Sequence, residues 1–126
     1  MRNIASGQTE SVRKILISDK SLLNLRIFDY VPLYYAARSG HYDIVVEMIL
    51  KMGCSLNFKG QKSTPLHCAA YYGHSKIVIL LLRCGISTKT KNSFGELPTD
   101  GAIDEIKQIF SQYEKALIAN TFITNN

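Results

Sequence analysis

The sequence predicts an all-α solenoid of helix-turn-helix units, and two observations carry this prediction. Pairs of residues recur at a spacing of 33 positions, which indicates stacked copies of one supersecondary unit. Within each copy, apolar residues recur at helical spacing and a glycine follows each expected helix. The recurring pairs are Pro32-Leu33 and Pro65-Leu66, Ala36-Ala37 and Ala69-Ala70, Gly40-His41 and Gly73-His74, and Ile44-Val45 and Ile77-Val78.

The unit at residues 60–92 shows the expected elements most clearly. Thr64 precedes Pro65, which is a helix N-cap residue followed by the residue best tolerated at the first helical position. A short inner helix with small apolar residues follows, and Gly73 supplies the left-handed conformation that ends it. A second, outer helix ends at Gly85, and its apolar stripe consists of Ile77, Val78, Leu81 and Leu82.

These residues, from Thr64-Pro65-Leu66-His67 through Gly73-His74 to Gly85, resemble the ankyrin-repeat signature. The resemblance implies an antiparallel helix pair in each repeat and β-hairpin-like fingers that project at about right angles. We expect a single domain over residues 1–126 with about four repeats, the terminal two being degenerate caps. Their approximate bounds are 1–26 for the N-terminal cap, 27–59 and 60–92 for the central repeats, and 93–126 for the C-terminal cap.

The second repeat departs from the signature in two places. Val31 and Tyr34 replace its threonine and histidine, so the hydroxyl–imidazole bond that links turn to helix should be missing there. One extra residue also lies between Ile44 and Gly53, nine steps where the third repeat takes eight. This insertion predicts either a longer outer helix or a local bulge.

The two ends depart further, as terminal repeats of a solenoid do. An N-terminal outer helix is preserved, but only six residues precede Gly7, so the first inner helix is shortened or the chain was cut from something longer. The C-terminal cap is expected to be one amphipathic helix, with residues 118–126 frayed. Its inward residues are Ile106, Ile109, Phe110, Tyr113 and Leu117, and its outward residues are Lys107, Gln108, Ser111 and Lys115.

Composition predicts an intracellular protein of the cytoplasm and/or nucleus. The longest apolar run, residues 77–82, is far shorter than a membrane span, and residues 1–12 contain no secretory signal. The net charge of +5 is moderate. Cys54, Cys68 and Cys84 have neither paired nor metal-like spacing, so we expect reduced thiols.

We find no motif of enzymatic chemistry and expect no catalytic residue, cofactor or metal site. The sequence contains no glycine-rich phosphate loop and no His-Glu-x-x-His. The repeat pattern accounts for all three histidines, His41, His67 and His74, as structural residues.

The resemblance implies that a partner protein lies along the concave face, which the fingers and the exposed positions of the inner helices form. Tyr71 and Tyr72 are the strongest candidates, because surface tyrosines carry much of a typical interface energy. The alternative is that their rings lie flat against a neighbouring element. Tyr34 and Tyr35, by contrast, are expected in the core. The candidate contact residues are Phe28, Tyr30, Arg38, Ser39, Gln61, Ser63, Tyr71, Tyr72, Phe94 and Glu96.

Two weaker surfaces complete the prediction. A basic finger edge consists of Lys59, Lys62, Lys89 and Lys91, and it is either an ordinary solvated surface or a site that attracts an acidic segment of the partner. On the convex side, Val46 and Ile79 make a small apolar spot, a candidate docking point for another domain or copy.

The sequence therefore predicts a protein–protein interaction module, an adaptor or targeting scaffold, with a monomer favoured. One alternative is a substrate-recruiting fragment of a larger enzyme, such as a modifying transferase or ligase. Another is a binder of nucleic acid or anionic lipid that uses the basic fingers, but the modest charge and the scarcity of arginine argue against it.

Overall fold

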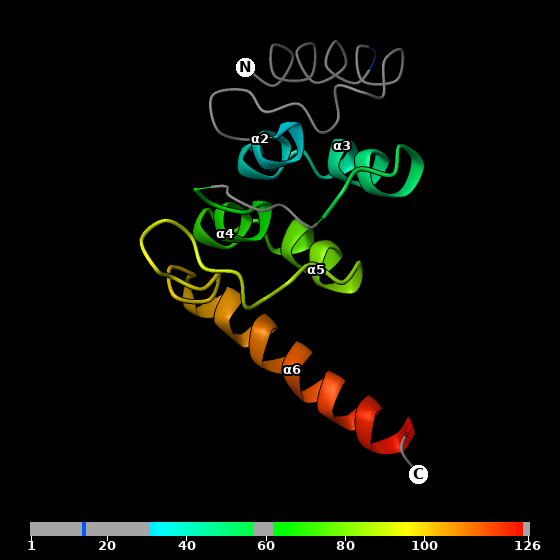
Figure 1. Cartoon of the computed structure of the whole chain (residues 1–126), viewed down its shortest axis with the longest axis vertical. Helices are drawn as coiled ribbons and strands as arrows, with labels where there is room; N and C mark the ends of the chain where they lie inside the picture. Colours follow the sequence, from blue (N-terminus) through cyan, green and yellow to red (C-terminus); the bar gives the residue numbers. More distant parts are fainter. Residues whose placement is uncertain (1–13, 15–30, 57–61, 125–126) are drawn as a thin grey trace.

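In the computed structural model, the described part of the chain comprises residue 14, residues 31–56 and residues 62–124, with side chains described as far as residue 119. This part forms a stack of helix pairs and contains no strand, which confirms the all-α solenoid (Figure 1). The inner helices lie side by side, and so do the outer helices. The elements are α2 (Pro32–Ser39), α3 (Tyr42–Val46), the π-helix η2 (Glu47–Lys51), α4 (Pro65–Tyr71), α5 (Ser75–Arg83) and α6 (Asp104–Thr124).

The start of α4 is fixed by the capping residues that the sequence predicted. The Thr64 hydroxyl lies 2.8 Å from His67 Nδ1, and the His67 amide donates to Thr64 Oγ1 over 3.3 Å. At the start of α2, Val31 makes no side-chain cap, as expected from its missing hydroxyl. The two central repeats therefore share a fold but differ in how their inner helices begin.

The extra residue of the second repeat is accommodated as a π-helical turn, so of the two predicted alternatives the structure shows the local bulge. The Met52 amide donates to the Glu47 carbonyl over 2.9 Å, which is the i→i−5 bond of a π-helix. Beyond this turn, Cys54 is buried like Ile86 in the third repeat. The bulge thus keeps the end of the second repeat in register with the stack.

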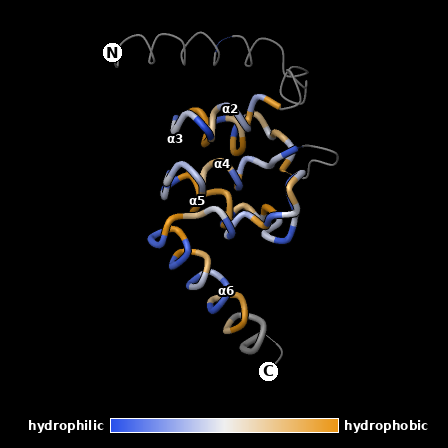
Figure 2. The backbone as a smooth tube through the Cα atoms, turned by 90° about the vertical axis from the view of Figure 1, so that its left-hand side faces the viewer, coloured by the Kyte–Doolittle hydropathy of each residue, from blue (hydrophilic) through white to orange (hydrophobic). Residues whose placement is uncertain are grey.

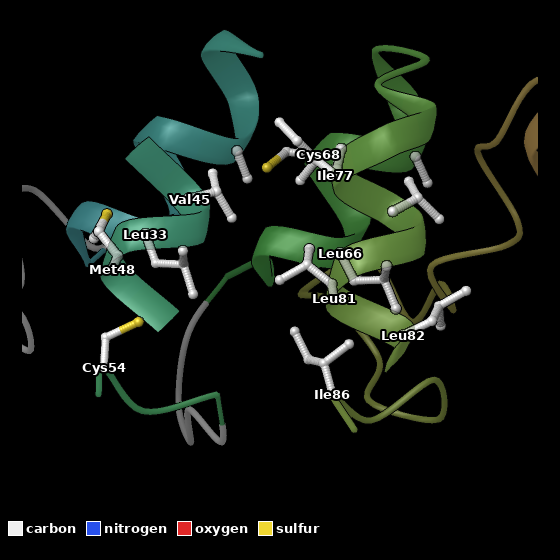
Figure 3. Close-up of a cluster of buried hydrophobic side chains, with 14 of the residues drawn as sticks. Leu33, Val45, Met48, Cys54, Leu66, Cys68, Ile77, Leu81, Leu82 and Ile86 are labelled. Carbon is white, nitrogen blue, oxygen red and sulfur yellow. The ribbon is translucent and has the colours of Figure 1, made fainter. Parts of the chain in front are cut away.

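The core lies between successive helix pairs (Figure 3). The alanines Ala37, Ala69 and Ala70 are completely buried, so α2 and α4 approach closely. Larger side chains fill the space between the pairs, and the labelled ones include Leu33, Val45, Met48, Leu66, Ile77 and Leu81.

The two tyrosines expected in the core, Tyr34 and Tyr35, are only half-buried. Tyr34 packs against the edge of the core. The ring of Tyr35 contacts the ring of Tyr34 edge to face, with centroids 5.6 Å apart. Their size explains this position, because the close approach of the alanine-rich inner helices leaves no room for a ring between them.

The cysteines match the expectation of free thiols. Cys54, Cys68 and Cys84 form no disulfide. Burial raises the pKa of Cys54 to about 11 and that of Cys68 to about 12, so both stay protonated and unreactive at neutral pH.

The C-terminal cap differs from the prediction in two respects. Its first half packs on α5 as expected, with Ile106 and Phe110 buried. Leu117, however, is 46% exposed. The later part of α6 projects away from the other helices, so it has little to pack on (Figures 1 and 2). The expected fraying of residues 118–126 is also wrong as far as Thr124, to which the helix continues, and residues 125–126 lie outside the described part. No glycine or proline follows Gly101, so nothing in the sequence breaks it.

Candidate functional site

The aromatic pair at the end of α4 is exposed to solvent. Tyr71 is 63% and Tyr72 is 49% exposed, so their rings, and not only their hydroxyls, reach water. The rings meet edge to face with centroids 5.0 Å apart and planes at 86°. This arrangement fixes two perpendicular aromatic surfaces beside each other.

The structure brings Arg38 onto this pair. Its guanidinium carbon lies 5.8 Å from the Tyr72 ring centroid, within cation–π distance. A hydrogen bond to the Tyr72 side chain is the main cause that raises the pKa of Arg38 above its ordinary value. Ser39, the other candidate at the end of α2, is exposed. His74 completes the connection between repeats, because its Nε2 lies 2.9 Å from the Arg38 carbonyl oxygen.

The finger between α5 and α6 is a tight turn held by Asn92, a residue that the sequence analysis did not single out. Asn92 Oδ1 accepts hydrogen bonds from the amides of Phe94 and Glu96, both at 2.9 Å. The Ser93 amide donates to the Lys62 carbonyl over 2.8 Å, which ties this finger to the segment before α4. The asparagine three residues before Gly95 was the signal that indicates such a turn.

Phe94 stands at the tip of this finger and is 85% exposed. Its backbone is held by the Asn92 bond, so the ring is presented on a defined turn. Phe94 was named as a candidate contact residue; the alternative, that its ring merely braces the finger, does not agree with a ring that is 85% exposed.

A pocket of about 160 Å³ opens between α4 and the finger. Ser63 and Glu96 from the candidate set line it together with Tyr71 and Tyr72. Its walls come from three consecutive units, which sequence reasoning could not bring together without the packing of α2 on α4. The lining residues that the sequence analysis did not assign to the site include Tyr34, Asn92, Leu97, Pro98 and Gly101.

The floor of the pocket is electrically neutral. Burial lowers the pKa of His67, and its Nε2 lies 2.8 Å from the Glu96 carbonyl oxygen. Because a carbonyl only accepts, the ring proton belongs on Nε2, and Nδ1 accepts from Thr64. The Cys68 thiol is protonated and lies 3.2 Å from the Pro65 carbonyl oxygen.

The structure describes three of the four lysines of the basic finger edge. Lys62 and Lys91 are exposed. Lys89 is exposed as well, but its Nζ lies 3.7 Å from Glu114 Oε1, so its charge is directed towards α6. Lys59 lies outside the described residues, as do the candidate contact residues Phe28, Tyr30 and Gln61.

The apolar spot predicted on the convex side is partly exposed. On the convex side, Ile79 is 37% exposed and Val46 is half-buried.

No group of three or more His, Cys, Asp or Glu side chains within the described ranges could hold a metal ion. None of the helices described is both long and apolar enough to cross a membrane.

The stack of helix pairs, in which the turn at Gly40 recurs at Gly73, defines a helical repeat protein of the solenoid type. A family model described as ankyrin repeats, in three copies, matches residues 1–92. This match covers more than half of the 126 residues, so the chain belongs to the ankyrin-repeat family.

Curated relatives agree with this assignment. The chain is 31% identical over 97 residues to the fem-1 homolog CG6966 of Drosophila melanogaster, a match that covers 70% of this chain and 15% of that protein. It is 43% identical over 58 residues to the ankyrin repeat and SAM domain-containing protein 3 of Homo sapiens, covering 45% of this chain and 9% of the relative. The match to alpha-latrotoxin-Lg1a of Latrodectus geometricus is 34% identical over 79 residues and covers 60% of this chain and 6% of the toxin. The chain thus spans a small part of the length of each relative.

Proposed function

We propose that this chain is an adaptor or targeting module that binds a partner protein on its concave face. Ankyrin repeats are in general protein-interaction modules, and the chain belongs to that family. The observation that supports this particular face is the exposure of Tyr71, Tyr72 and Phe94, three large aromatic side chains that stay largely in contact with solvent in the packed stack.

Aromatic side chains in this state are typical anchors of an interface. They bury a large area, and few rotamers are lost when they bind. Tyr71 and Tyr72 stand on a helix, and Phe94 stands on a turn fixed by Asn92. Such pre-organisation lowers the entropy lost on binding, so the same contacts yield a higher affinity.

The proposal extends to the charge of the partner. Lys62 and Lys91 lie beside the finger and are exposed, and they would attract an acidic segment of the partner. The chain acts by recognition as a monomer and performs no catalysis, in an intracellular compartment whose reducing conditions suit three free cysteines.

Affinity capture from a native cell extract tests the proposed face. The wild-type chain and a Tyr71→Ala/Tyr72→Ala variant serve as baits, after circular dichroism has shown that both are equally folded. We expect a protein that the wild type retains and the variant loses, because truncation of a central anchor costs about 2 kcal/mol or more.

A matched variant controls for the loss of exposed apolar area. Leu50→Ala/Ile79→Ala removes two exposed apolar side chains from the outer helices and should capture the same partner as the wild type. Loss of the partner from this control, with retention by the tyrosine variant, would place the interface on the convex side and contradict the proposal.

A further inference from the structure

Three tyrosines, from two successive repeats, are among the residues that line the pocket beside α4. Tyr71 and Tyr72 contribute perpendicular rings, and Tyr34 contributes a third ring from the preceding repeat. Tyr71 lies against the cap, since a Cβ at Gly101 would stand 3.5 Å from Tyr71 Cδ1. The pocket is about as large as a cavity that accepts a benzene-sized group, so it has room for the end of one side chain.

The charges of the lining residues indicate which kind of group this pocket accepts. Among the described residues that line it, Glu96 carries the one formal charge. His67 and Cys68 are neutral for the reasons given above. One Glu96 oxygen accepts from Asn92 Nδ2 over 3.1 Å, which orients the carboxylate without neutralising it. Ring faces are also negative, so the lining as a whole favours a positive group.

The charged neighbours outside the lining are of both signs, so the preference for a positive group rests on Glu96 and the ring faces within the lining. Asp100, beside Gly101, holds the turn through a 2.7 Å bond from the Leu97 amide and adds a second negative charge. Arg38 is the nearby positive group, and it already uses Tyr72 as a cation–π partner at 5.8 Å. The ring system therefore already holds one guanidinium group within the molecule itself.

We propose that this pocket binds one cationic side chain, arginine or lysine, of the partner protein, between the tyrosine rings and the Glu96 carboxylate. The inference rests on the proposed function and makes it more specific. Ser63 and Asn92 of the lining directly follow Lys62 and Lys91 in the sequence, so these exposed lysines lie close to the pocket. The recognised segment then combines one basic residue for the pocket with acidic residues next to it for the lysines.

Small probes test the pocket without knowledge of the partner. N-acetyl-arginine amide, N-acetyl-lysine amide and N-acetyl-citrulline amide are titrated into the full chain, and the backbone amide shifts are followed by NMR. Citrulline has almost the shape of arginine but no charge. We expect saturable shifts at Tyr71, Tyr72 and Gly101 with the two cations, at concentrations about tenfold lower than with citrulline. Equal effects of arginine and citrulline, or no shift at these residues, would overturn the inference.

A pair of charge-neutralising variants identifies the responsible carboxylate. Glu96→Gln keeps the shape of the side chain and should weaken the arginine probe roughly three- to tenfold. Glu114→Gln makes the same chemical change at an exposed position of α6 outside the pocket and should leave the affinity unchanged. Equal affinities of Glu96→Gln and the wild type would contradict the proposed role of Glu96.

The capture experiment separates this inference from the proposed function. If the tyrosine variant loses the partner while Glu96→Gln retains it with wild-type affinity, the concave interface stands and the cation site fails. If the probes bind as expected but the tyrosine variant captures the same proteins as the wild type, the pocket's preference for cations stands, while the concave interface fails and with it the partner as the source of the cation.

Discussion

His67 joins two segments of the chain through its two ring nitrogens. Nδ1 accepts from Thr64 at the start of α4, and Nε2 bonds the Glu96 carbonyl oxygen in the finger over 2.8 Å. The bond from the Thr64 hydroxyl requires the neutral ring with Nδ1 unprotonated, whereas Nε2–H donates to the Glu96 carbonyl in either protonation state. A single buried imidazole therefore fixes the inner helix against the finger that carries Phe94, and protonation would remove the acceptor at Nδ1 but not the bond to the finger.

The stability of the fold should depend on the titration of His67. Its pKa in the folded state lies below the ordinary value of 6.5, mainly because burial disfavours the charged form. The unfolded chain then binds the proton first as the pH falls through 6.5, so stabilisation present above that pH is lost below it. Urea unfolding at pH 7.5 and pH 5.5 should show a larger loss for the wild type than for His67→Gln.

The comparison with His67→Gln removes the contribution of all other titrating groups, which both proteins share. An equal loss in both proteins, or a wild type that gains stability on acidification, would contradict the neutral, buried state of this ring.

Among the glycines within the described residues, Gly40 has the least tolerance for a side chain. Its φ is +78°, and an added Cβ would lie 2.7 Å from Cε1 of His74, whose ring bonds the Arg38 carbonyl. Gly85 has a similar φ of +86° but nothing within 4 Å. Gly85→Ala should therefore cost only the left-handed backbone term, about 1 kcal/mol, whereas Gly40→Ala should cost about 2 kcal/mol or more. Unfolding curves of the two variants measure the difference, and equal costs would refute the contact with His74.

At the scale of elements, the sequence predicted the helices where a local pattern decides them. The caps at Thr64, the end of α4 near Gly73 and the insertion before Gly53 are all local signals, and each appears in the structure. The position of Leu117 was wrong for a reason that is not local. The amphipathic pattern of α6 continues through Leu117, but the surface of α5 on which it packs does not.

The candidate site was predictable to a similar extent. Tyr71, Tyr72 and Phe94 follow from their positions in the repeat, and the structure finds all three exposed. The pocket was not predictable, because its lining converges from α2, α4 and the cap only when the units stack. Repeat register thus places single residues, whereas a site shared between units requires the packing.

The π-helical turn η2 should tolerate deletion of one residue. Leu50 is 65% exposed, and its removal would give the second repeat the spacing of the third, leaving Met48 buried on the same side. We expect the unfolding free energy to change by less than about 1 kcal/mol. Deletion of Ile79, 37% exposed in the regular helix α5, is the control.

That control deletion rotates Leu81 and Leu82 out of the core and should cost more than about 3 kcal/mol. Circular dichroism in urea compares the two proteins. If deletion of Leu50 is as damaging as deletion of Ile79, the bulge is a required part of the second repeat and does not simply accommodate an insertion.

At the scale of the whole molecule, the fold is a series of layers in which each unit contacts its neighbours. The inner helix α2 packs on α4, the outer helix α3 packs on α5, and α6 packs on α5. The end of the stack is covered by the first half of α6, while its second half projects beyond the other helices (Figure 2). Stability in such an array is approximately a sum of unit and interface terms.

This organisation predicts that damage to the cap spreads unevenly along the chain. Phe110 is 2% exposed at the interface with α5, so Phe110→Ala should cost about 3 kcal/mol or more there. Native-state hydrogen exchange should then show faster exchange of the amides of α5 and α6, with the amides of α2 and α3 much less affected. Leu117→Ala, in the projecting half of α6, should leave exchange in all of these helices unchanged. A uniform acceleration by Phe110→Ala in every helix would mean that the stack unfolds as one unit, so that loss of the cap would also release Tyr71 and Tyr72 from their fixed arrangement.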